Sequence, residues 1–107
     1  MIPAPPISWQ EPWLPIHDES EWRGLQTELE KELSSAHPLW DSGASVFGRH
    51  QGCDDVLVAL HDGRFAIVHL VWHGKIDQYP DKYPWTVLYD DITTLQKGLD
   101  EESEVWK

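Results

Sequence analysis

The sequence predicts an α+β domain: an antiparallel four-stranded meander with one helix before it and one after it. Two observations carry this prediction. A hairpin pattern is centred on Asp62-Gly63, and two other segments have apolar residues at helical spacing. An N-terminal arm rich in proline and tryptophan, residues 1–16, should be extended and cover part of the sheet. We therefore expect this arm and a single α+β domain over residues 17–107.

The hairpin is the most regular part of the sequence. Runs of Val, Ile, Leu and Phe flank Asp62-Gly63, a pair that readily adopts the positive φ angles of a tight turn. With these two residues in the turn, Leu60 lies opposite Phe65 and Val56 lies opposite His69. Both faces of the resulting hairpin are apolar. We therefore expect a layer of structure to cover each side of the sheet.

The remaining elements follow from local signals. A first helix begins after the capping residue Asp18 or Ser20 and ends before Pro38. Residues 44–50 form a short strand with a bulge or edge position at Gly48, and residues 85–89 form another strand. A second helix follows Asp90 or Asp91. Its acidic end at residues 100–104 is typical of a solvated, frayed terminus, unless Val105 and Trp106 hold it against the body. The buried stripes of the two helices are Trp22, Leu25, Leu29, Leu33 and Ile92, Leu95, Leu99.

The charge balance excludes several classes of function. Eight Lys and Arg against 19 Asp and Glu give a net charge of −11, which would repel nucleic acids and anionic membrane surfaces. The acidity serves either solubility alone or the binding of a protein partner with a basic surface. No apolar run of about 20 residues is present to span a membrane. A single cysteine, Cys53, and the absence of a signal-peptide pattern favour a cytoplasmic protein.

Catalytic and metal-binding patterns are weak. The six histidines have no recognised ligand spacing, so we expect no metal and no cofactor. Cys53 with His50 suggests a nucleophile and a base, but the neighbouring Asp54 and Asp55 would disfavour the thiolate. His69 is expected to be a buried, hydrogen-bonded histidine. The sequence therefore favours an interaction protein over an enzyme.

Surplus aromatic residues point to recognition at one end of the hairpin. We expect a binding surface formed by Trp72, His73, Tyr79, Tyr83 and Trp85, unless these rings close the end of the core. The favoured function is a small protein-interaction module, of which immunity or antitoxin-like proteins are one form. The alternative is a small-molecule-binding or catalytic domain with a pocket near Trp72, His69 and Trp85. The arm offers a third possibility, a homodimer formed through it.

The second half of the chain resembles a known group of proteins. The stretch DDVLVALHDGRFAIVHLVW, followed by Pro84 and a strand, is similar to a hairpin shared by small uncharacterised bacterial proteins. The resemblance implies a bacterial cytosolic origin and a hairpin-centred fold, and it implies no reaction. The arm and the first helix lie outside it. The matching residues are Asp54, Asp55, Asp62, Gly63, Arg64, Val68, His69, Leu70, Trp72 and Pro84.

Overall fold

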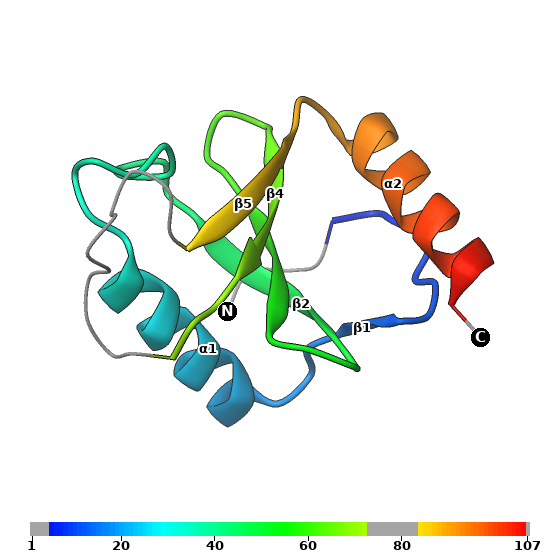
Figure 1. The fold of residues 1–107 in the computed structure, drawn as a ribbon, viewed down its shortest axis with the longest axis horizontal. Coiled ribbons are helices and arrows are strands. Elements are labelled where there is room, and N and C mark those ends of the chain that lie inside the picture. Colours follow the sequence, from blue (N-terminus) through cyan, green and yellow to red (C-terminus); the bar gives the residue numbers. More distant parts are fainter. Residues whose placement is uncertain (1–4, 73–83, 107) are drawn as a thin grey trace.

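The computed structural model describes residues 5–72 and 84–106. It contains a five-stranded antiparallel sheet with strand order β1-β2-β3-β4-β5, which confirms the α+β class and corrects the expected four strands to five. Helix α1 (Glu19–Glu32) precedes the meander of β2 to β5, and α2 (Ile92–Val105) follows it (Figure 1). The strands are β1 (Trp13–Pro15), β2 (Ser45–His50), β3 (Asp55–Ala59), β4 (Phe65–His69) and β5 (Trp85–Tyr89).

The additional strand comes from the arm. Trp13 pairs with His50 and Pro15 pairs with Gly48, so β1 forms one edge of the sheet. Sequence reasoning missed this strand because prolines remove backbone donors, but an edge strand tolerates proline where its N–H would face away from the neighbouring strand. The side chain of Trp13 is 1% exposed. The arm is therefore an integral part of the fold.

The hairpin between β3 and β4 has a register that differs by one residue from the expected one. Leu60 N–H donates to Arg64 O at 2.9 Å, which leaves a three-residue loop ending at Gly63 with φ 92°. Three-residue loops of this kind need a left-handed last residue, and glycine supplies it. Asp55 consequently pairs with His69, and Val56 pairs with Val68. The predictions that His69 faces Val56 and is buried are both wrong, since its side chain is 48% exposed.

Each face of the sheet is covered, as the two apolar faces of the hairpin predicted. On one face, α1 packs Leu29 and Leu33 against a cluster that includes Val56 and Val68. On the other face, Leu95 and Leu99 of α2 pack against Leu57, Phe47 and Phe65, with Ile7 and Trp9 of the arm beside them. Figure 1 shows α1 and α2 on opposite sides of the sheet.

Both helices begin at the expected caps. The Asp18 carboxylate accepts from Ser20 N–H at 2.7 Å, and the Asp91 carboxylate accepts from Thr94 N–H at 2.8 Å. These bonds satisfy backbone donors that the first helical turn leaves open. The strand at residues 45–50 is interrupted where expected, by a register shift between Val46 and Gly48. Neither α1 nor α2 is long and apolar enough to cross a membrane.

Candidate protein-interaction surface

The C-terminal half of α2 carries an unusual concentration of negative charge. Asp100, Glu101, Glu102 and Glu104 all lie there, and the last turn of the helix contains no basic residue. The C-terminus of a helix is the negative end of its macrodipole, and in the last turn, which here holds Glu102 and Glu104, each anion costs about 0.3–1 kcal/mol. The arrangement therefore works against the stability of α2 unless a structural role or a partner offsets it.

Glu102 has such a structural role. Its carboxylate accepts from the Trp13 indole N–H at 2.8 Å and contacts His50 Nε2 at 3.0 Å. The Gly52 N–H donates to His50 Nδ1 at 2.9 Å, so the neutral ring carries its proton on Nε2 and donates it to Glu102. The rings of Trp13 and Trp106 pack edge-on against His50. Glu102 thus joins α2 to both β1 and β2.

The other three carboxylates have no comparable role. We call Asp100, Glu101 and Glu104 the α2 acidic end. Asp100 accepts one hydrogen bond, from Gln96 Nε2 at 2.9 Å, on the exposed face of the helix. Glu101 and Glu104 are exposed. The sequence indicated a solvated, frayed end that Val105 and Trp106 could hold in place; α2 continues in helical form to Val105, and the Trp106 ring packs against His50.

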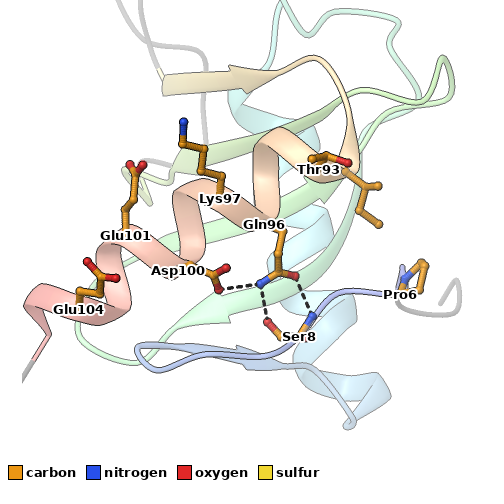
Figure 2. A pocket seen from close by; sticks show the side chains of 9 residues that line it. Pro6, Ser8, Thr93, Gln96, Lys97, Asp100, Glu101 and Glu104 are labelled. Atoms are coloured by element: carbon orange, nitrogen blue, oxygen red, sulfur yellow. Dashed lines mark hydrogen bonds between the residues drawn. The ribbon is translucent and has the colours of Figure 1, made fainter.

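The arm and α2 together form a groove at this surface. Gln96 accepts from the Ser8 N–H at 2.7 Å and donates to the Ser8 carbonyl at 3.1 Å, so one amide side chain fixes the arm to the helix. Figure 2 shows Gln96 and Asp100 turned towards the arm, and Lys97 and Glu101 turned away from it. The hollow has a volume of about 560 Å³. Its lining residues are Pro6, Ser8, Ile92, Thr93, Gln96, Lys97, Asp100, Glu101 and Glu104.

A second hollow continues this groove. It measures about 470 Å³ and is lined by Gln10, Asp100, Ser103 and Glu104, so Asp100 and Glu104 border both hollows. Because the lining contains several carboxylates and only one basic side chain, Lys97, the groove suits cationic groups.

The aromatic residues predicted from the sequence lie elsewhere. Trp72 is 48% exposed and Trp85 is 62% exposed, so neither ring closes the end of the core. His69 and Trp85 are paired across β4 and β5. Neither residue lines the groove between the arm and α2. His73, Tyr79 and Tyr83 lie outside the described residues.

One polar cluster lies where β3 begins and β4 ends, away from the hairpin turn that joins them. The Asp55 carboxylate contacts His69 Nδ1 at 2.6 Å. Partial burial of the thiol and the negative charges of Asp55 and Glu102 raise the pKa of Cys53. A thiol that keeps its proton is a poor nucleophile. Among residues 5–72 and 84–106, no three His, Cys, Asp or Glu side chains lie close enough to hold a metal ion.

Sequence reasoning missed a buried pair of carboxyl groups on α1. Glu28 is 6% exposed and Glu32 is 1% exposed, although neither belongs to the predicted buried stripe of this helix. The Glu32 carboxylate accepts from Val71 N–H and Trp72 N–H, each at 2.9 Å. Burial, reinforced by the hydrogen bond and charge of Glu28, raises the pKa of Glu32 from 4.5 to about 7. The i,i+4 spacing of the pair is visible in the sequence, but its burial beneath residues 70–72 is not.

No protein-family model, curated protein or solved structure matches the chain.

Proposed function

We propose that this protein is an interaction module that binds a protein partner with a basic surface through the α2 acidic end. The observation that carries the proposal is the placement of Asp100, Glu101 and Glu104 at the negative end of a helix. Natural sequences place residues that lower local stability mainly where function requires them. Lys or Arg side chains of a partner would offset both the mutual repulsion of these carboxylates and their conflict with the helix dipole.

The charge of the whole chain supports the same function. A net charge of −11 on 107 residues creates a field that attracts basic proteins from a distance and repels acidic ones. Such association is fast at low ionic strength and weakens as salt screens the charges. Neutralising a basic effector, as an immunity protein or antitoxin does, is one biological form of this function, and a cytoplasmic location would suit it.

Capture from a lysate of the cells that produce the protein tests the proposal. The variant Glu101→Gln/Glu104→Gln removes two charges at the α2 acidic end, and the matched control Asp54→Asn/Asp90→Asn removes two exposed charges elsewhere. The wild type and the control should retain the same basic protein at low salt, and the first variant should retain much less of it. Equal retention by all three chains, or no specific partner at low salt, would refute the proposal.

A second candidate is a small-molecule-binding or catalytic site at the opposite end of the sheet from the hairpin turn. The specific observation is the Asp55 and His69 pair, beside which Trp85 presents a largely exposed ring. Fragment screening by NMR tests it: a ligand should shift the Trp85 indole and lose affinity in His69→Ala. A screen in which no fragment shifts Trp85, or in which His69→Ala binds equally well, would remove this candidate.

A further inference from the structure

The loop between α1 and β2 is held firmly in place. His37 is 4% exposed; its Nδ1 accepts from Leu39 N–H at 3.0 Å, and its Nε2 donates to Pro84 O at 2.8 Å. The Ser42 hydroxyl donates to Leu39 O at 2.6 Å, and Ser42 O accepts from His61 N–H at 2.9 Å. These bonds tie the loop to β5 and to the hairpin turn. The loop is therefore a fixed support for the side chains that it carries.

Trp40 extends from this fixed loop into solvent. Its side chain is 53% exposed, while the adjacent Leu39 is 1% exposed. The next residue, Asp41, has φ 58°, a left-handed conformation that aspartate and asparagine adopt more readily than other residues with a Cβ. The hydrogen-bonded loop therefore presents the Trp40 indole to solvent from a fixed backbone.

Trp40 borders a hollow of about 360 Å³ between the loop and α1, which we call the Trp40 hollow. Leu33 and Leu39, both buried, contribute apolar surface to it, and Glu30 and Asp41 contribute carboxylates. None of the described residues that line it is basic. The full lining is Gln26, Glu30, Leu33, Leu39, Trp40, Asp41, Ser42, Gly43 and Ala44.

We propose that the Trp40 hollow binds an arginine side chain of a basic protein partner. A guanidinium group stacks on an indole face, forms a paired hydrogen bond with a carboxylate, and is more weakly hydrated than an ammonium group. The methylene groups of the arginine would lie against Leu33 and Ala44, which line the hollow. Arginine and tryptophan are also the residues that most often dominate the binding energy of protein interfaces.

Other occupants fit the hollow less well. An anionic group would be repelled by Glu30 and Asp41, and a purely apolar group would remove these carboxylates from water without compensation. A second copy of this chain is a poor source of arginine, because Arg23, Arg49 and Arg64 already form ion pairs. Their partners are Glu19, Glu21 and Asp62, at 3.2, 3.3 and 2.7 Å.

This site is separate from the one proposed above. Figure 1 shows the loop that follows α1 at one end of the long axis and the C-terminal half of α2 at the other. The long axis measures 35 Å. The Trp40 hollow is therefore a second contact, and its test does not depend on the α2 acidic end.

Titration of the full chain with a short peptide tests the proposal. The peptide acetyl-Gly-Gly-Arg-Gly-Gly-amide is compared with the same peptide containing citrulline, which keeps the shape of arginine without its charge. NMR should show saturable shifts of the Trp40 indole and the Ser42 amide with the arginine peptide, and at least about tenfold weaker binding of the citrulline peptide. Free L-arginine has the same net charge as the peptide, but its α-ammonium and α-carboxylate groups are strongly hydrated, so it should not bind more tightly than the arginine peptide.

Three variants locate the effect. Asp41→Asn removes a charge while keeping a residue type that tolerates the left-handed conformation, and should weaken binding severalfold in an unchanged loop. Trp40→Ala should abolish binding, and the matched control Trp85→Ala should not change it. Glu101→Gln/Glu104→Gln should bind the peptide as the wild type does, even if that variant loses the partner captured at α2.

Several results would overturn the proposal. They are equal binding of the arginine and citrulline peptides, unchanged affinity in both Trp40→Ala and Asp41→Asn, or absence of saturable shifts at Trp40. Tighter binding of free L-arginine than of the peptide would show that the hollow binds a small molecule and not a protein side chain.

Discussion

The carboxyl groups of Glu28 and Glu32, one turn apart on α1, are hydrogen bonded to each other in the interior of the protein. Two buried carboxyl groups that share a hydrogen bond favour a state in which one of them keeps a proton. Glu32 also fixes the chain where it leaves β4, since its oxygens accept from Val71 N–H and Trp72 N–H. The protonation of this pair is therefore linked to the stability of the fold.

The first prediction concerns pH. The pKa of Glu32 is about 7 in the folded protein and 4.5 in its ordinary state, so the folded protein holds the proton more tightly than the unfolded chain does. The resulting stabilisation is fully present below pH 4.5 and is lost as the pH rises to about 7, a change on the order of 3 kcal/mol. Urea unfolding at several pH values between 4.5 and 8 measures it.

The variant Glu28→Gln provides the comparison for this prediction. It removes the charge next to Glu32 and leaves an amide that donates to the Glu32 carboxylate, so the pKa of Glu32 should fall. The loss of stability between pH 4.5 and 7 should therefore be smaller than in the wild type. Parallel pH profiles of the two chains would contradict this account.

The second prediction concerns Glu102. In Glu102→Gln, one oxygen and one NH₂ group replace two acceptors that face the N–H groups of Trp13 and His50. One donor is then left facing another donor, which should lower the free energy of unfolding by about 2 kcal/mol. Glu101→Gln, an exposed substitution on the same helix, should change it by less than about 0.5 kcal/mol. Similar urea midpoints for both variants would refute the role of Glu102.

The third prediction compares two glycines. A Cβ at either Gly24 or Gly63 would meet no atom within 4 Å, so steric clashes do not separate the two positions. Gly63 has φ 92° at the hairpin turn, and Gly63→Ala should destabilise the protein by about 1–2 kcal/mol. Gly24 lies within α1, and Gly24→Ala should stabilise the protein by up to about 1 kcal/mol. Thermal unfolding should shift in opposite directions for the two variants.

The fourth prediction concerns the reactivity of Cys53. Because burial and nearby carboxylates raise the pKa of this thiol, iodoacetamide should modify it more slowly at pH 7.5 than it modifies a free cysteine. Asp55→Asn removes the nearest of these charges and should accelerate the reaction, whereas Asp54→Asn should have less effect. A rate equal to or above that of free cysteine would restore the nucleophile interpretation.

Local signals predicted most of the fold. The caps at Asp18 and Asp91, the interruption near Gly48 and the strand Trp85–Tyr89 each depend on a few neighbouring residues, and each was predicted. The β3 and β4 register was wrong because both faces of this hairpin are apolar, so the pattern does not distinguish two registers that differ by one residue. Strand β1 requires its partner in β2, which lies more than 30 residues away along the chain.

The candidate sites were harder to predict than the fold. The acidity of residues 100–104 was evident, but its position at the negative end of a continuous helix required the structure. Trp40 was one tryptophan among seven, and its exposure depends on how His37 and Ser42 fix the loop. Of the predicted aromatic surface, only Trp72 and Trp85 lie among the residues that the structure describes.

The bond between Trp13 and Glu102 joins residues 89 positions apart, and the bonds between Ser8 and Gln96 join residues 88 positions apart. During synthesis, β1 can pair with β2 early, but the bonds from the arm to α2 cannot form until α2 has left the ribosome. Contacts this distant in sequence are slow to form, because a long loop must close before they stabilise anything. We expect the docking of α2 on the sheet and the arm to be the last step of folding, with the change in the surroundings of Trp13 as its spectroscopic marker.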